Sequence, residues 1–404
     1  MLRINRTAQF YTVCMGILLL LILLSNRRYI FDERIFVSNL PVIEQYGFSQ
    51  QLFTEIRDQS PGPLYQIVHF LCKPLTQYNP LAMRILNYVF LWVIIAFICI
   101  IMRFHGIHSV FLKALLIIAI PMTWPLAGMA LSEIPALLFC CAALVLFEYS
   151  LRLKDIIASY GCALFGGLCL GLSIIGRSPF LVLFIPFVLF AKRDNWKKLA
   201  VFYIFGSILP AIAFSIWHGL VPADVAGIQS GWNIWYGMLG ISYLAFVTLL
   251  IVPNWFLSSL RTYRLAGASF ILFSLFNIFF FKISFFPLHS TMLGIFGVQV
   301  IKYISYICPV FFVIIGLFFI KQGYNHVIAH RSDTLFIFSV LASVLIVATA
   351  VKSSAQFSSR YVAQCIPFII MYASFFEIKK YTLYYHICGI AIGICSLVSY
   401  YITN

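Results

Sequence analysis

The sequence predicts an all-α integral membrane protein with about thirteen transmembrane helices, within a range of about 11 to 13. Of its 404 residues, 62% are hydrophobic and only 10% are charged, whereas soluble domains carry about 25% charged residues. The mean hydropathy is +0.99, and the apolar residues form long runs. These observations exclude a soluble globular domain.

The candidate spans are apolar runs close to the roughly 20 residues that cross a bilayer as a helix. They lie near residues 9–24, 84–102, 110–126, 131–149, 157–175, 179–191, 200–217, 236–257, 265–281, 303–320, 334–350, 362–376 and 385–401. Arg3 and Arg6 precede the first run as in a secretory signal, but no small-residue cleavage site follows it. We therefore expect this run to be retained as the first helix.

Basic residues orient the predicted spans. With the amino terminus in the cytoplasm, the terminus and the turns on its side hold more than half of the 27 Lys and Arg residues, as the positive-inside rule requires. The formal charge of +15 is therefore explained by a chain oriented in a lipid bilayer. We do not expect the protein to bind nucleic acid. Most of the 11 cysteines lie in apolar runs without a C-x-x-C pair, so we expect buried apolar side chains.

The opposite, non-cytoplasmic side carries the longest predicted loops. These loops cover residues 25–83, 218–235 and 282–302. The same side holds seven of the 12 acidic residues, namely Asp32, Glu33, Glu44, Glu55, Asp58, Glu133 and Asp224. Long ordered loops on one face are where binding chemistry tends to lie.

The first of these loops contains a predicted amphipathic helix. In "PLYQIVHFLCKPL" (63–75), apolar side chains recur with helical spacing at Leu64, Ile67, Val68 and Leu71, which is typical of a helix on the membrane surface. The stretch 41–56 is a candidate for a second surface helix, interrupted by Gly47.

Two adjacent carboxylates, Asp32 and Glu33, follow the first span within "YIFDERIF". Partial burial of a carboxylate at the end of a membrane helix favours its use as a general base, which is the role we expect here. The alternative is a solvated pair that Arg27, Arg28 and Arg34 neutralise.

Proline and glycine form a turn in "RDQSPGPLYQ" (57–66), directly before the amphipathic helix. Such a turn fixes the direction of the side chains that follow it, and it makes Tyr65 and His69 candidates for substrate binding. The alternative is a plain turn that starts a helix.

"LSEIP" (131–135) has the pattern of a helix start, with Ser132 as the N-cap. The positive end of the helix dipole favours the carboxylate of Glu133 at this position. Glu133 is thus either a substrate ligand or only a capping carboxylate.

Arg177 lies where "GLSIIGRSPFLVLFIP" (171–186) breaks two short apolar runs. Because an unpaired guanidinium in hydrocarbon is costly, we expect Arg177 to face a cavity. Its natural partner there is a phosphate, and pairing with Glu133 is the compatible alternative.

Further cations are predicted on the same side. "VKSSAQFSSRYVAQCIP" (351–367) carries Lys352 and Arg360 before a late span. With Arg177, Lys302 and His289 they are candidates for an anion clamp, although each alone is more often a flank residue that reaches for the interface.

Motifs for other chemistries are missing from the sequence. The histidines His105, His108, His326 and His330 lie on predicted cytoplasmic turns, and there is no H-E-x-x-H or D-x-D spacing, no Walker loop and no G-x-S-x-G, so we predict no bound metal and no cofactor.

The order "FDERIF", "SPGPLY", "MRILN", "LSEIPA", "IIGRSP" and "SRYVAQCIP" resembles multi-spanning glycosyltransferases of the GT-C superfamily. It is similar to the aminoarabinose and protein-mannosyl transferases and to the dolichol-pathway alpha-1,2-glucosyltransferase. The likeness covers residues 9–195 in arrangement and the Arg-Tyr segment near 360. The chain departs from the aminoarabinose and protein-mannosyl transferases because it lacks a Lys before its equivalent of their Pro-Pro-Leu-Tyr element. It departs from these transferases and from the glucosyltransferase because it lacks a sizeable C-terminal soluble domain.

The resemblance implies a GT-C-like module over 1–199, with a catalytic first loop, and variable membrane helices over 200–404. It implies inverting transfer of a sugar from a polyprenyl- or dolichyl-phosphate donor to a glycan, lipid or protein acceptor. Asp32 or Glu33 would be the base, and Arg177, Lys352, Arg360 and Lys302 would bind the donor phosphate. Aromatic residues such as Trp232 would stack on the sugar.

The implied membrane is a bacterial plasma membrane or the endoplasmic reticulum, with the active site on the non-cytoplasmic side. The rival classes are a lipid or glycan flippase or transporter, and a glycan polymerase or ligase. A transporter more often has two related halves, and no second copy of the first-loop pattern is present.

Overall fold

The computed structural model describes residues 2–59, 61–191, 195–222, 225, 231–286, 289–353 and 357–403. Every regular element in these ranges is helical, which confirms the predicted all-α membrane class. Ten helices among the described residues are long and apolar enough to cross a membrane. They are α1 (Leu2–Leu23), α7 (Pro80–Phe104), α10 (Glu133–Arg152), α11 (Ile156–Gly176), α13 (Trp196–Trp217), α15 (Ile234–Ile251), α16 (Leu260–Phe276) with the π-helix η5 (Asn277–Phe281), α17 (His289–Ala329), α18 (Thr334–Ala348) with η6 (Thr349–Lys352), and α21 (Thr382–Thr403).

Three of the predicted spans are broken into short pieces, which lowers the count from about thirteen to ten. The pieces are α8 (Val110–Ala114), η1 (Leu115–Ala119) and α9 (Thr123–Gly128); η2 (Ser178–Leu183), α12 (Phe184–Phe187) and η3 (Val188–Phe190); and α19 (Arg360–Ala363) and α20 (Ile366–Ala373). Prolines lie in or beside each of them, and proline removes a backbone donor from a helix. Such backbone is tolerated at membrane depth only where protein or a cavity surrounds it.

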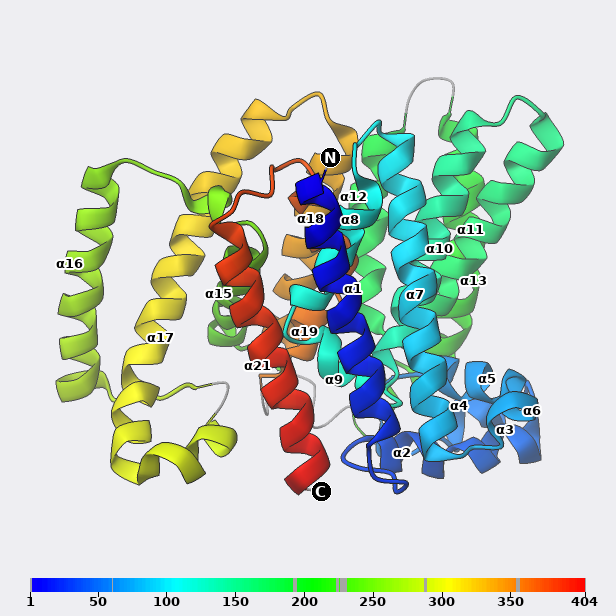
Figure 1. Cartoon of the computed structure of the whole chain (residues 1–404). Coiled ribbons are helices and arrows are strands. Elements are labelled where there is room, and N and C mark those ends of the chain that lie inside the picture. Colours follow the sequence, from blue (N-terminus) through cyan, green and yellow to red (C-terminus); the bar gives the residue numbers. More distant parts are fainter. Residues whose placement is uncertain are drawn as a thin grey trace.

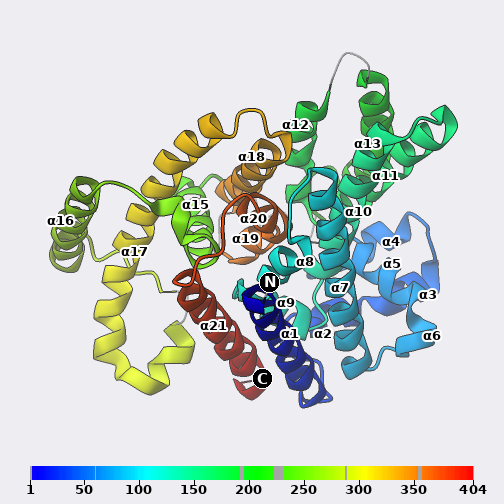
Figure 2. The same cartoon turned by 45° about the horizontal axis from the view of Figure 1, so that its top comes forward.

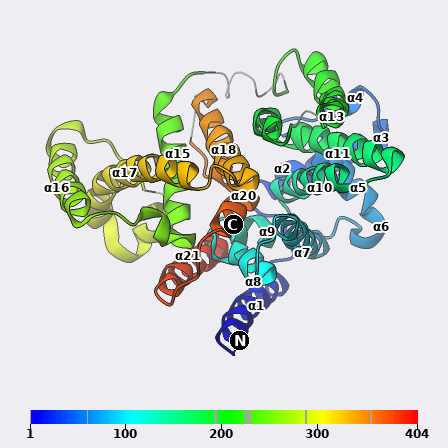
Figure 3. The same cartoon turned by 90° about the horizontal axis from the view of Figure 1, so that it is seen from above.

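Parts of two broken segments lie in the middle of the bundle. Figure 2 shows α9, α19 and α20 near the centre, and Figure 3 shows α9 and α20 there, surrounded by long helices of both halves of the chain. Helix α20 contacts α18, α15 and α7, and α9 contacts α21, α7 and α1. By contrast, α16 stands at the edge of the molecule, beside α17 (Figure 1). The centre of the fold is therefore where irregular backbone and polar side chains meet.

The first loop forms short helices at one end of the bundle (Figure 1). They are α2 (Glu33–Ser38), α3 (Leu40–Tyr46), α4 (Gln51–Thr54), α5 (Leu64–Leu71) and α6 (Lys73–Thr76). Gly47 ends α3 with a φ of 58°, so the predicted interruption is confirmed. The amphipathic helix also forms, but Leu64 and Val68 are buried, and α5 packs on α10 and α11. The protein therefore covers Leu64 and Val68, contrary to the expectation that this face rests on lipid, whereas Leu71 is 65% exposed.

Three buried amides hold the first loop together. The Asn39 amide donates to the carbonyl oxygens of Ile35 and Arg57, at 3.0 and 2.9 Å. The Gln59 amide donates to Pro61 O at 2.9 Å. The Gln66 amide donates to Gln59 Oε1 at 3.0 Å. Because buried backbone and amide groups must be paired, this network gives the loop one conformation.

The predicted division near residue 199 stays a prediction.

Candidate active site

The two adjacent acids of the first loop point to different partners. Phe31 has a φ of 48°, in the left-handed region that L-residues rarely adopt, and it turns the chain immediately before Asp32. The Asp32 carboxylate then lies 2.6 Å from Nη2 of Arg360, and its side chain is 27% exposed. Glu33 is fully buried. One acid thus borders open space and the other belongs to the protein interior.

Glu33 forms a bidentate ion pair with Arg84 of α7. The Arg84 Nε and Nη2 groups donate to its two oxygens at 2.8 and 2.6 Å. The backbone N–H groups of Ile30 and Ala130 donate to the same carboxylate at 2.9 and 2.7 Å. The Arg84 guanidinium also donates to Ser25 Oγ and to the carbonyl oxygens of Asn26 and Arg28. This cluster joins the ends of α1 and α7 to the segment before α10.

The role of Arg84 was not predicted, although the residue lies in the "MRILN" motif. The available signal was an arginine in the first turns of an apolar span, since such a residue needs a partner. Asn87, in the same motif, donates to the carbonyl oxygens of Met129 and Leu131 at 2.9 and 3.1 Å. The motif therefore holds the "LSEIP" segment in place.

A chain of alternating charges continues from Asp32. The Arg360 Nε group lies 3.4 Å from Glu133 Oε1, and Arg177 Nη2 contacts the same oxygen. The predicted pairing of Arg177 with Glu133 is therefore present. Arg177 also donates to Ser132 Oγ at 2.8 Å, whereas its Nε has no hydrogen-bond partner among the described residues. A buried donor left in this way is available to a ligand.

The two arginines stay charged. Burial acts to lower the pKa of Arg360, but the carboxylates of Glu133 and Asp32 outweigh it and raise the pKa. Burial lowers the pKa of Arg177, and Glu133 opposes that shift. Since arginine begins from a pKa above 12, both guanidinium groups carry a positive charge at neutral pH.

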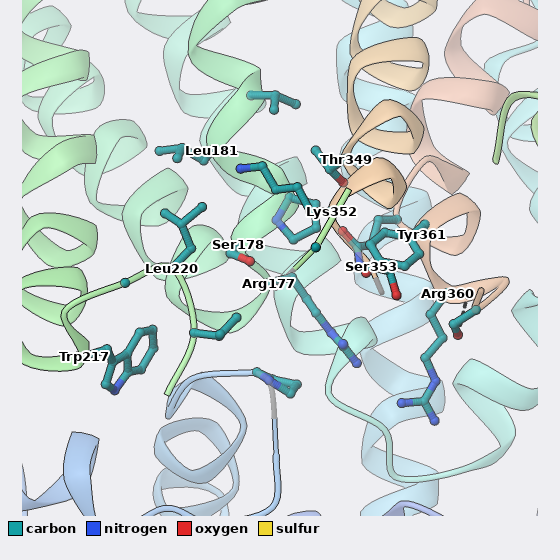
Figure 4. A pocket seen from close by; sticks show the side chains of 18 of the residues that line it. Arg177, Ser178, Leu181, Trp217, Leu220, Thr349, Lys352, Ser353, Arg360 and Tyr361 are labelled. Carbon is teal, nitrogen blue, oxygen red and sulfur yellow. Dashed lines mark hydrogen bonds between the residues drawn. The ribbon is translucent and has the colours of Figure 1, made fainter. Parts of the chain in front are cut away.

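Two cavities meet at the Asp32–Arg360 pair. The polar cavity has a volume of about 860 Å³ and is lined by Arg177, Lys352, Trp217, Trp232, Tyr361 and Gln364, among others. Figure 4 shows Arg177, Lys352 and Arg360 around it. The aromatic cavity, of about 850 Å³, is lined by residues that include Tyr243, Phe246, Phe285, Phe311, Phe312 and Phe357. Both cavities are bordered by Asp32, Arg360, Ser353 and Ser358.

The structure gathers some of the predicted site residues around the polar cavity. They are Asp32, Arg177, Lys352, Arg360 and the exposed Trp232. Glu133 joins them through its contacts with the two arginines. Lys352 has neither an ion pair nor a hydrogen bond within the described part of the chain, so its charge is free to hold an anion.

Other predicted residues lie elsewhere. Tyr65 and His69 are buried, with ring centroids 4.2 Å apart, and line neither cavity. Burial lowers the pKa of His69 to about 3, so this histidine is neutral. Lys302 borders a third cavity and neither of the two cavities that meet at the Asp32–Arg360 pair, so it is not part of the cation cluster. The side chain of His289 lies outside the described residues.

The Pro-Gly-Pro turn carries the first loop to the cavity, and Gly62 is the residue that allows this. Its N–H donates to Ile175 O at 2.9 Å. A Cβ at this position would lie 2.6 Å from the Trp217 ring and closer still to the Ile175 carbonyl.

We expect Gly62→Ala to destabilise the protein by about 1–3 kcal/mol, measured by thermal unfolding in detergent. Gly16→Ala is the matched control, since no atom lies within 4 Å of its added Cβ. Equal stability of the two variants would contradict this account of the turn.

No protein-family model matches the chain, and no curated protein sequence is similar to it. The fold is similar to that of ArnT from Cupriavidus metallidurans. With its apo state the TM-score is 0.44 at 11% identity, over 97% of this chain and 77% of ArnT. With ArnT bound to undecaprenyl phosphate the TM-score is 0.45 at 13% identity, over 96% of this chain and 77% of ArnT. The chain has ten described helices that are long and apolar enough to cross a membrane, and its helix arrangement resembles that of ArnT at low sequence identity.

Proposed function

We propose that this protein is an inverting glycosyltransferase. It moves a sugar from a polyprenyl-phosphate or dolichyl-phosphate donor to a glycan, lipid or protein acceptor. The reaction takes place at the end of the bundle that carries the first loop, which we assign to the non-cytoplasmic face.

The observation that carries this proposal is the meeting of the two cavities at one carboxylate and one guanidinium. Asp32 and Arg360 border both the polar cavity, which contains the cations Arg177 and Lys352, and the aromatic cavity. A polyprenyl phosphate is part anion and part apolar chain. The aromatic cavity suits its chain, and Arg360, Arg177 and Lys352 suit its phosphate.

The chemistry follows from these groups. The acceptor hydroxyl oxygen attacks the anomeric carbon as Asp32 takes the hydroxyl proton. The bond from this carbon to the phosphate oxygen breaks, and its electron pair remains on the phosphate. The cations stabilise the departing phosphate more strongly as its charge grows, which lowers the barrier.

Asp32 and Glu33 receive different roles in this proposal. Asp32 is the base, since it borders both cavities and is partly exposed. Glu33 is a positioning residue, since four donors occupy its carboxylate. Glu133 holds Arg177 and Arg360 beside each other despite their like charges.

The proposal is tested by supplying radiolabelled polyprenyl-phosphate sugars to membranes with and without the protein. A new labelled lipid, glycan or protein that requires the chain supports transfer. Movement of intact donor across vesicle membranes, without a labelled product, would instead identify a flippase.

Gln364 is expected to bind the transferred sugar. The residue is 3% exposed, its Oε1 has no hydrogen-bond partner in the described part of the chain, and it borders the polar cavity. Losing one hydrogen bond to a sugar hydroxyl costs about 0.5–1.5 kcal/mol. We therefore expect Gln364→Leu to lower kcat/KM by up to about tenfold, measured from initial rates.

A second buried glutamine provides the control. Gln322 donates to Leu257 O at 3.0 Å and borders none of the three cavities. Gln322→Leu should keep the kcat/KM of the folded protein. A Gln364→Leu variant with unchanged kcat/KM would remove Gln364 from the sugar site.

A further inference from the structure

A third cavity, of about 480 Å³, lies beside α17. It is bordered by Ser284, Phe285, Phe286, Lys302, Ser305 and Tyr306, together with Val298. Of these residues, Phe285 and Phe286 also border the aromatic cavity, whereas Lys302 and Ser305 border neither of the two cavities described above. Among the described residues no acidic side chain borders this cavity, so Lys302 gives it a positive charge.

Hydrogen bonds from Asn277 fix the wall of this cavity. Asn277 begins the π-helix η5, and its amide donates to the carbonyl oxygens of Ile283 and Tyr306 at 2.8 and 2.6 Å. Its Oδ1 accepts from the Ile283 N–H at 3.0 Å. Phe285 N–H donates to Ser305 O at 2.9 Å. The segment 283–286 is thus held against α17, and π-helical turns are frequent at functional sites.

Two polar groups of the cavity have no partner. Ser305 is 5% exposed, and its hydroxyl makes no hydrogen bond within the described residues. A buried hydroxyl without a partner is costly, which indicates that a ligand or water satisfies it. Lys302 is exposed and makes no ion pair among the residues that the structure describes. An ammonium group beside a hydroxyl is a suitable pair of donors for a phosphate.

The position of the cavity indicates the source of that phosphate. Lys302 lies in the first turns of the membrane-crossing part of α17, Gly297–Ala329, and is therefore near the membrane edge. This end of α17 is also the end that carries the first-loop helices (Figure 1). Phe285 and Phe286 border both the third cavity and the aromatic cavity, so an apolar chain bound at Lys302 has phenylalanine rings to lie against.

We propose that the third cavity binds a phosphate group carried by a lipid, with Lys302 and Ser305 as its donors. The apolar chain of this lipid lies against Phe285 and Phe286. The site is separate from the Asp32–Arg360 pair and does not depend on the transferase reaction. Polyprenyl phosphates and anionic phospholipids share the chemistry that it recognises.

The test uses the full-length protein in detergent with a photoreactive farnesyl monophosphate. Labelled peptides are identified by mass spectrometry. We expect labelling of the segments around Phe285 and Lys302, and we expect Lys302→Gln to reduce it by about tenfold or more. Ser305→Ala should reduce it less. Lys321→Gln is the matched control, because Lys321 is an exposed lysine on the same helix that borders none of the three cavities.

Competition experiments identify the source of the phosphate. Unlabelled farnesyl monophosphate or phosphatidylglycerol should displace the probe, and the more effective of the two names the lipid class. Equal displacement by inorganic phosphate would overturn the lipid assignment, and equal displacement by farnesol would overturn the phosphate site. Unchanged labelling in Lys302→Gln would also overturn the phosphate site. Lys302-dependent labelling in a protein without transferase activity would support this site and reject the proposed function.

Discussion

Replacing Asp32 by asparagine is expected to lower the rate of sugar transfer by about 10²- to 10⁴-fold, the usual contribution of a general base. Asparagine has the same shape but cannot take the acceptor proton. The fold should survive, since the Asp32 side chain is partly exposed and Arg360 retains Glu133 at 3.4 Å. Initial rates at saturating donor, with gel filtration to check folding, measure the effect.

A comparison of kcat with the KM for the donor separates a base from a residue that only holds Arg360. If Asp32 is the base, Asp32→Asn should lower kcat and leave the KM for the donor nearly unchanged, whereas loss of a residue that only holds Arg360 should raise the KM for the donor. Glu55→Gln is the matched control, because Glu55 lies in the same loop, contacts Arg57 at 3.6 Å and borders neither the polar nor the aromatic cavity. An Asp32→Asn variant that keeps most of the native rate would reject Asp32 as the base.

The position of the site along the bundle could be predicted from the sequence. Asp32, Glu133, Arg177 and Arg360 each lie at an end of an apolar run, and alternation of the spans places those ends on one face. Lys302 meets the same criterion, yet it borders a different cavity. Hydropathy gives the depth of a residue in the membrane, whereas its lateral position depends on helix packing, which hydropathy does not encode.

The difference between Asp32 and Glu33 could not be predicted either. Successive residues of a helix point about 100° apart, so only one of the two can face Arg84. Which one does so depends on the left-handed turn at Phe31 and on the Ala130 N–H from a distant segment. The broken spans were missed for a related reason, since an apolar run with prolines has the same hydropathy as a continuous helix.

Arg84→Met is expected to have the largest effect on stability. The guanidinium donates to Ser25, Asn26, Arg28 and both oxygens of Glu33, and methionine replaces none of these bonds. Removing one partner of a buried ion pair costs about 3–5 kcal/mol, because the other charge stays buried. Lysine should not restore stability, since it cannot form the two parallel hydrogen bonds. Thermal unfolding in detergent measures the loss, with Arg103→Met, an exposed arginine at the other end of α7, as the control.

A double-mutant cycle shows whether the lost stability belongs to the pair. Glu33→Gln alone leaves Arg84 without its counter-charge, and the double variant removes both charges. If the two residues act on each other, the double variant should lose less stability than the sum of the single variants, by more than about 0.5 kcal/mol. Because this pair holds the turn from which Asp32 reaches Arg360, the single variants should also lose transfer activity while Asp32 is still present. Additive losses of stability would show that the two side chains do not stabilise each other. Full transfer activity in Arg84→Met would show that Asp32 is positioned without this pair.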